Sequence, residues 1–257
     1  MGAAMSLARS AKTHLKVYWQ IDPEMNTKFA DLFEPIPEVK VVDTTCGNYW
    51  QRAIFHRFNF LMNRAPAWPI RSDAVACAKG FRPWSVSTCS EFYANPDYGW
   101  IRPRAGIARE IEGEWSRMTV SDTEDGIIGV HIRRTDNAKA IEFSPIELFV
   151  SRMEQELVRS PKARFFVATD DCPTKELLKR HFGEHIITRE QVAERDAQNG
   201  VQDALIDLML LSRCSRIFGS YWSSFSGVAA MIGGCPLEIM KVGYSREDVT
   251  SDGMKTL

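Results

Sequence analysis

Residues 126–136 read GIIGVHIRRTD, and this stretch decides the fold. Its first seven residues, Gly126 to Ile132, form a continuous apolar run, which is typical of a parallel strand covered on both faces. The run then changes to two arginines, a threonine and an aspartate. We therefore predict a buried strand that carries Arg133 and Arg134 at its carboxyl end.

Helix and strand patterns alternate along the chain from residue 144 to residue 240. Further strands are predicted at residues 164–169, 185–188, 216–219 and 237–240, and helices at about 144–158, 173–183, 201–214 and 223–232. In the first of these helices Ser144 is the expected N-cap and Pro145 the first helical residue. This alternation predicts a parallel sheet with right-handed crossovers. The fold class is therefore α/β, with a Rossmann-like C-terminal lobe flanked by helices.

The first half of the chain has a different texture. It holds six of the seven tryptophans, and prolines interrupt residues 64–104. Helices are expected at residues 3–11 and 107–118, and strands at residues 14–20 and 39–43. We predict two lobes, residues 1–122 and residues 123–257, of which the first is the less regular α/β unit.

Composition excludes several classes of function. Thirty-two basic and thirty-three acidic residues give a formal charge of −1, which argues against nucleic acid as a partner. The six cysteines contain no CxxC pair and no zinc spacing, so we expect reduced packing residues and no metal site. No stretch reaches the roughly 20 apolar residues that span a bilayer. The expectation is a soluble protein, cytoplasmic by default.

Ligands of open parallel sheets bind beyond the carboxyl ends of the strands. The double arginine lies at such an end, and arginine forks suit phosphate oxygens. Strand alternation places His131 and Arg133 on one face and Arg134 on the other. The structural alternative is an ion pair of either arginine with Asp136 at the sheet edge.

Two further strand ends carry polar residues. Asp170 and Asp171 follow the strand at residues 164–169, where a ribose diol or the donor edge of a guanine would suit the carboxylates; alternatively, Asp171 is only a helix N-cap. Ser223 and Ser224 open a helix, whose free N–H groups attract phosphate, although serine N-caps are common without a ligand. Asp207 lies among apolar residues of the preceding helix, one turn after Asp203, which we expect to be solvated.

These stretches together resemble the fucosyltransferase superfamily that contains the α1,6-, α1,2- and protein-O-fucosyltransferases. HIRRTD looks like its first motif, H-x-R-R-x-D, and FFVATDD resembles its second. The run from Asp207 through Ser223 and Ser224 resembles its third. The similarity covers roughly residues 125–240.

The resemblance implies a two-lobed GT-B fold and inverting, metal-independent transfer of fucose from GDP-fucose to a glycan or glycoprotein hydroxyl, with no cofactor besides this donor. Residues 1–122 would be the acceptor-side lobe and residues 123–257 the nucleotide-sugar lobe. By motif, the donor would be bound by His131, Arg133, Arg134, Asp170, Asp171, Asp207, Ser223 and Ser224. His131 and Asp136 would order the arginine loop, Asp207 would support the site, and the catalytic group would comprise Arg133, Arg134, Asp136 and Glu142.

Two departures from the family pattern keep alternatives open. Family members carry a G-x-G-N-R-type loop near the N-terminus, whereas this chain starts at a helix-like MGAAM; a truncated start would allow a location in the secretory-pathway lumen. The position of the family's general base is Ile141, so neighbouring Glu142 is a candidate base. The alternative functions are transfer from another nucleotide sugar such as GDP-mannose, and non-catalytic binding of a nucleotide sugar or glycan.

Overall fold

The computed structural model describes residues 1–21, 25–45, 96–119, 126–135, 137–189 and 199–243. The chain divides into two compact units, one comprising Met1–Arg104 and the other Ala105–Thr256. The division therefore lies after residue 104, whereas the sequence suggested residue 122. As a result, the helix α5 (Ala105–Met118) groups with the C-terminal unit.

The C-terminal unit is built on a five-stranded sheet in which every neighbouring pair is parallel. Its strands are β3 (Ile127–Ile132), β4 (Arg164–Thr169), β5 (Ile186–Ile187), β6 (Arg216–Ser220) and β7 (Leu237–Met240). Their order is β5-β4-β3-β6-β7, so the strand that carries the double arginine is central. All six residues of β3 are buried, which confirms the prediction from the apolar run.

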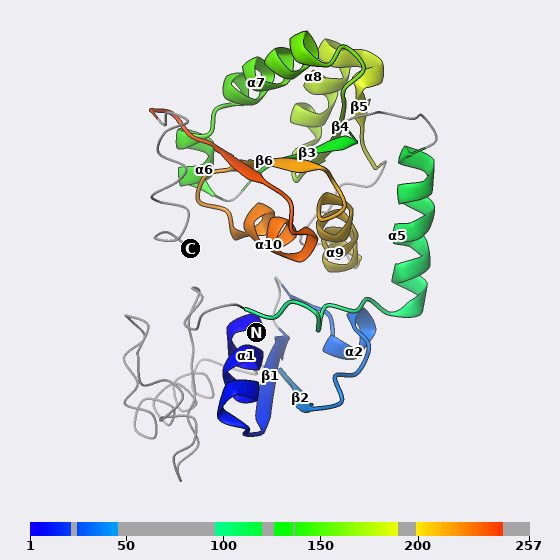
Figure 1. The fold of residues 1–257 in the computed structure, drawn as a ribbon, viewed down its shortest axis with the longest axis vertical. Helices are drawn as coiled ribbons and strands as arrows, with labels where there is room; N and C mark the ends of the chain where they lie inside the picture. The colour runs from blue at the N-terminus through cyan, green and yellow to red at the C-terminus, as the bar shows by residue number, and fades with distance from the viewer. Residues whose placement is uncertain (22–24, 46–95, 120–125, 136, 190–198, 244–257) are drawn as a thin grey trace. The chain divides into compact units, whose positions relative to one another are not determined.

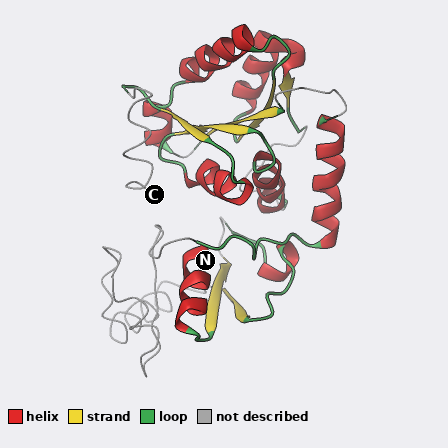
Figure 2. Ribbon diagram, viewed as in Figure 1, coloured by secondary structure: helices red, strands yellow, loops and turns green. Residues whose placement is uncertain are grey.

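Helices cover both faces of this sheet (Figures 1 and 2). The helices α7 (Ile146–Arg159) and α8 (Cys172–Phe182) lie on one face, and α9 (Gly200–Leu211) and α10 (Ser224–Gly233) lie on the other. Alternate residues of β3 serve the two layers. Ile128, Val130 and Ile132 belong to one buried cluster with residues of α7 and α8, namely Phe149, Met153 and Leu178. Gly129 faces the other layer, where an added Cβ would meet Leu211 of α9 at 2.9 Å. The predicted α/β class with a helix-flanked parallel sheet is thus confirmed.

One predicted helix start is wrong. A six-residue helix that the sequence analysis missed, α6 (Ala138–Phe143), precedes α7, and Ser144 ends it as its C-cap. Pro145, which was expected inside α7, is the N-cap of that helix. Ser144 is fully buried, where its hydroxyl donates to the Met240 carbonyl and accepts from the Tyr221 N–H, so tertiary contacts take the place of the expected cap.

The N-terminal unit contains the helix α1 (Gly2–Ala11), the short helix α2 (Phe29–Leu32) and the parallel strands β1 (Leu15–Ile21) and β2 (Val39–Thr45). Within the described residues, α1, β1 and β2 agree closely with the predicted elements, whereas α2 was not predicted. Trp19, Phe29, Phe33 and Trp100 pack their rings together beside the strand pair. Of the predicted irregular segment, residues 64–95 lie outside the described residues. No helix within the described ranges is long and apolar enough to cross a membrane.

Candidate functional site

Side chains from three neighbouring strands meet at the carboxyl edge of the five-stranded sheet. Arg133 follows β3, Asp170 follows β4, and Ser220 ends β6. The Arg133 N–H donates to the Ser220 Oγ at 3.0 Å, and the Arg133 Nη1 lies 3.0 Å from the Asp170 Oδ2. Both charged side chains are largely buried, with 17% and 10% of their surfaces exposed. The edge therefore holds Arg133 in a defined position.

Asp170 binds the loop that carries the arginines. Its Oδ1 accepts the Arg134 N–H at 2.8 Å, and its Oδ2 accepts the Thr135 hydroxyl at 2.7 Å, the Thr135 N–H at 3.4 Å and the ion pair from Arg133. A carboxylate offers about four lone-pair positions. Asp170 uses both oxygens on donors from Arg133, Arg134 and Thr135, so it orders the arginine loop. Asp136, to which the sequence analysis gave that role and the alternative ion pair, lies outside the described residues.

The Arg134 side chain contacts the end of α6. Its Nη2 donates to the Ser144 carbonyl at 3.0 Å and its Nη1 to the Ile141 carbonyl at 3.4 Å, at the carboxyl end of α6. A cation is stabilised at a helix carboxyl end, where carbonyls lack partners. The two arginines thus have different partners, and Arg134 acts within the fold as the anchor of α6.

His131 is buried on the α10 side of β3. Its ring stacks on Phe225 with centroids 4.8 Å apart, and 5% of the residue is exposed. Burial lowers the pKa of His131 to about 4, although the Asp170 carboxylate acts in the opposite direction, so the imidazole is neutral at pH 7. Its Nδ1 has no hydrogen-bond partner among the described residues. A buried, unpartnered nitrogen carries a cost that a ligand or water could relieve.

The N-terminus of α10 lies at the same edge. Ser223 is its N-cap, yet the Ser223 side chain makes no capping hydrogen bond, and Ser224 is exposed at the first helical position. The helix packs closely on β6, because a Cβ at Gly219 would lie 2.3 Å from the Ser226 Oγ. Uncapped N–H groups beside a fixed arginine make this corner suitable for an anion.

The remaining predicted residues have separate positions. Asp171 caps α8, since its Oδ2 accepts the Thr174 N–H at 2.8 Å, as the structural alternative expected. Glu142 is exposed on α6. In the sequence it stands between Ile141 and Ser144, whose carbonyls accept hydrogen bonds from Arg134. The structure therefore brings together His131, Arg133, Asp170 and the start of α10, and it places Arg134 and Asp171 in structural contacts.

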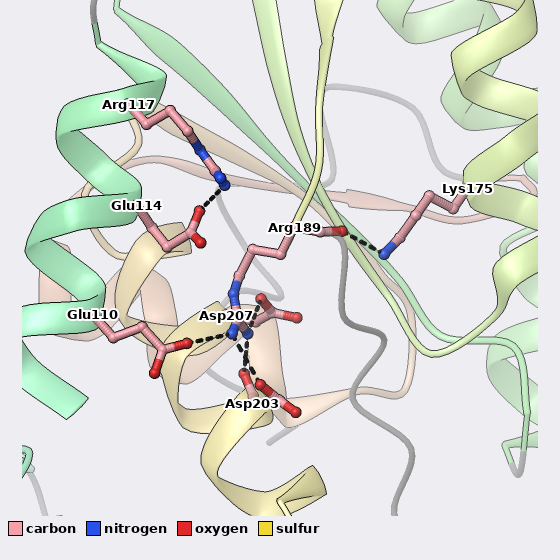
Figure 3. Close-up of polar contacts among 7 residues, drawn as sticks. All are labelled: Glu110, Glu114, Arg117, Lys175, Arg189, Asp203 and Asp207. Carbon is pink, nitrogen blue, oxygen red and sulfur yellow. Dashed lines mark hydrogen bonds and ion pairs between the residues drawn. The ribbon is translucent and has the colours of Figure 1, made fainter. Parts of the chain in front are cut away.

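Asp207 belongs to a buried ion cluster that Figure 3 shows. Arg189, which follows β5 and is 1% exposed, contacts Asp207 at 3.3 Å, Asp203 at 2.9 Å and Glu110 of α5 at 3.0 Å. Lys175 of α8 donates to the Arg189 carbonyl at 2.8 Å. Burial raises the pKa of Asp207 to about 6, against the opposing charge of Arg189. This cluster fastens α5 and α9 to the end of β5, and Asp203 is a member of it, contrary to the expected solvated position.

Sequence reasoning missed two residues of this edge. Arg189 is the second residue after β5 and directly follows the strand predicted at residues 185–188, which is the same signal that identified Arg133. Ser220 is fully buried, and its Oγ joins β6 to β3 by donating to the His131 carbonyl at 3.3 Å and accepting from the Arg133 N–H. Nothing in the sequence distinguishes Ser220 from the other serines of that segment.

Comparison with solved structures identifies the fold. A structure of NodZ α-1,6-fucosyltransferase soaked with GDP-fucose is 17% identical, with a TM-score of 0.55 over 90% of this chain and 86% of its own. Fucosyltransferase NodZ from Bradyrhizobium is 18% identical, with a TM-score of 0.56 and coverages of 89% and 85%. POFUT1 in complex with GDP is 11% identical, with a TM-score of 0.50 and coverages of 93% and 92%.

No protein-family model matches the chain. The similarity to these structures extends along most of each chain, so the fold that the resemblance implied is confirmed. The protein has the GT-B-like α/β fold of the fucosyltransferases.

Proposed function

We propose that the protein is an inverting glycosyltransferase that transfers fucose from GDP-fucose to a hydroxyl of a glycan or protein. One observation carries the proposal: Arg133 is fixed by Asp170 and Ser220 at the sheet edge where α10 begins without a side-chain cap. This corner supplies a guanidinium and backbone N–H groups for a diphosphate. The shared fold supports fucose and GDP as the donor's parts, because a NodZ crystal was soaked with GDP-fucose and POFUT1 was solved in complex with GDP.

In the proposed reaction the acceptor oxygen attacks the anomeric carbon of fucose from the side opposite the diphosphate. The bond between that carbon and the diphosphate oxygen breaks, and its electron pair leaves with GDP. Arg133 and the N–H groups of α10 stabilise the developing negative charge, and their effect is large because the fold orients them beforehand. The proposed transfer is metal-independent, with the protein's own cation and N–H groups in the place of a metal ion.

The acceptor proton passes to a carboxylate in this scheme. Glu142 is the proposed base because it is exposed on α6, close in sequence to the arginine loop. Asp171 is proposed for the nucleoside end next to β4, while Asp207 supports that end by holding Arg189. Asp170 and Arg134 are proposed as positioning residues, because their contacts with the protein are already numerous.

The test compares Arg133→Ala with Arg180→Ala, which removes the same charge from an exposed position on α8. GDP binding is measured by calorimetry and transfer by GDP release. We expect Arg133→Ala to lower kcat/KM by about 100-fold or more, the effect of one well-placed charge stabiliser. Arg133→Lys should recover little, since lysine lacks the guanidinium fork. Near-wild-type transfer by Arg133→Ala would disprove the assignment.

The donor is tested separately by thermal shift with GDP-fucose, GDP-mannose, UDP sugars and CMP sugars, because a ligand of the folded state raises the melting temperature. GDP-fucose should give the largest shift. A larger shift with GDP-mannose would change the donor, and GDP binding without turnover would indicate a non-catalytic binding protein. The anomeric configuration of the product, read by NMR, tests inversion.

A further inference from the structure

Trp222 has an unusual position in the loop between β6 and α10. It is 53% exposed, the highest exposure of any described aromatic residue, although tryptophan is on average among the more buried residue types. Its φ of 58° lies in the left-handed region, which side chains other than glycine, asparagine and aspartate rarely adopt. Neither burial nor backbone preference explains a tryptophan at this point.

The surrounding contacts hold Trp222 in this strained conformation. Asn137 donates from its Nδ2 to the Trp222 carbonyl at 2.8 Å, while its Oδ1 caps α6 by accepting from the Ala140 N–H at 3.1 Å. The Tyr221 N–H donates to the buried Ser144 Oγ at 2.8 Å. The loop is therefore fixed on both sides of the bond that carries the strain. Such strain persists where surrounding structure maintains it, and it concentrates at ligand sites.

The indole ring is oriented as well as exposed. The Lys139 Nζ lies 3.9 Å from its centroid, and the Tyr221 ring lies 5.7 Å away at 57°. A cation over an aromatic face is attracted by the ring's electrons. Lys139 thus positions the ring, while more than half of the residue's surface remains open to a ligand.

The place of Trp222 in the chain limits what that ligand can be. The next residue is Ser223, the N-cap of the helix to which the proposed function assigns the diphosphate. The donor sugar is covalently attached to that diphosphate, and the acceptor sugar must approach the same anomeric carbon. A pyranose ring is therefore the group expected beside the indole, and its apolar C–H face is complementary to an aromatic ring.

We infer that Trp222 is a stacking platform for a pyranose ring of the reacting sugars and that Lys139 is its positioning residue. The inference rests on the proposed function for the identity of the sugar. Two sources provide the same chemistry, the fucose of the donor and a sugar of the acceptor, and the two are separated by measurement.

The variant that tests the platform is Trp222→Gly, because glycine adopts a positive φ without strain and removes the ring. Its melting temperature should equal or exceed that of the wild type. Trp222→Phe keeps an aromatic ring. The matched control is Trp115→Ala, which removes a tryptophan of α5 that also has a cation over its ring, Arg213 at 5.9 Å.

Affinities for GDP and GDP-fucose are measured by calorimetry, and the acceptor KM by transfer. We expect a loss of about tenfold in Trp222→Gly, as for about 55 Å² of apolar surface at about 25 cal/mol per Å². Trp222→Phe should lose less than about threefold, and Trp115→Ala should change neither value. Weaker binding of GDP-fucose with unchanged GDP assigns the donor sugar to the platform, and a higher acceptor KM with unchanged kcat assigns the acceptor sugar. Unchanged GDP-fucose affinity together with unchanged acceptor KM in Trp222→Gly overturns the inference.

A second measurement separates this inference from the proposed function. The indole N–H resonance of Trp222, identified by its absence in Trp222→Phe, is followed during titration with methyl α-L-fucopyranoside and methyl β-D-galactopyranoside. If the wild type binds no GDP sugar, the proposed function fails, and this titration alone decides the platform. A saturable shift of that resonance supports it, and no shift with either glycoside overturns it.

Discussion

Two adjacent aspartates at the end of β4 have different roles at the scale of single residues. Asp170 accepts from Arg133, Arg134 and Thr135, whereas Asp171 accepts from the Thr174 N–H at the start of α8. In Asp170→Asn one carboxylate oxygen becomes an NH2 group, which would face the N–H donors of Arg133 or Arg134 and could not accept from them. We expect this variant to lose about 2 kcal/mol of stability and about tenfold in GDP affinity, because hydrogen bonds to charged groups are lost.

Asp171→Asn is the matched control for the stability part of this prediction. It removes the same charge one residue away, but asparagine caps helices about as well as aspartate, so the change in stability should stay within about 0.5 kcal/mol. Chemical denaturation measures the stabilities and calorimetry the GDP affinities. Because Asp171 is itself proposed for the nucleoside end, the control for GDP affinity is Glu176→Gln, which removes one negative charge from an exposed position on α8. Equal losses of GDP affinity in Asp170→Asn and Glu176→Gln would mean that net charge, and not the order of the arginine loop, controls binding.

The sequence could predict that Arg133 and Asp170 are neighbours, because carboxyl ends of adjacent parallel strands meet at one edge. It could not predict that Asp170 uses its oxygens on the loop itself, since those contacts depend on the conformation of residues after the strand. Arg189 directly follows the predicted strand at residues 185–188, so its place at the edge could be predicted. Its ion pairs could not, because Glu110, Asp203 and Asp207 come from the helices α5 and α9. Local patterns therefore locate the edge but not the partners along it.

At the scale of elements, two fully buried serines differ in what they join. The Ser144 hydroxyl connects the end of α6 to the Met240 carbonyl and the Tyr221 N–H. The Ser226 Oγ on α10 has no partner among the described residues. We expect Ser144→Ala to cost about 2 kcal/mol, since both partners lose a hydrogen bond in a buried place. Ser226→Ala should be neutral or slightly stabilising, because it removes a hydroxyl that was desolvated without compensation.

Differential scanning calorimetry checks this pair of substitutions. A loss of about 2 kcal/mol corresponds to a decrease of roughly 4–8 °C in Tm for a chain of this size. Because both changes delete one oxygen from a fully buried side chain, volume effects are matched. A similar decrease in Ser226→Ala would show that packing, and not hydrogen bonding, determines both results.

The elements that were predicted well each have a hydrophobic pattern that is long enough to indicate a strand or a helix. The strands β4 and β7 occupy the predicted residues, and β3 differs by one residue at its start. The helix α6 escaped because six residues make too few turns for a periodic pattern. The Ser-Pro pair that follows resembles a helix start, but burial of Ser144 gave its hydroxyl stronger tertiary partners. The local pattern therefore predicted the longer elements, while tertiary contacts determined where α6 ends and α7 begins.

At the scale of the whole molecule, the proposed nucleotide contacts all come from the C-terminal unit. Arg133, Asp171 and the start of α10 belong to that unit, as does the Arg189 cluster that fastens α5 to it. The sequence indicated two units, because the regular alternation of strand and helix patterns begins only with the strand predicted at residues 126–132. The boundary itself was harder to locate because α5 has an amphipathic pattern that suits either unit.

Hydrogen exchange on the full chain tests the assignment of the nucleotide to one unit. With GDP at about 100 times its Kd, the bound state gains about 2.7 kcal/mol, so amides that open only with the ligand released should exchange up to about 100-fold more slowly. We expect this protection in residues 133–135 and 223–227 and little change in β1 and β2, because the proposed diphosphate site lies at the ends of β3 and β6. Arg133→Ala should remove the protection at the same GDP concentration, whereas Arg180→Ala should retain it. Protection that is confined to β1 and β2 would place the nucleotide in the N-terminal unit and would exclude the sheet edge as its site.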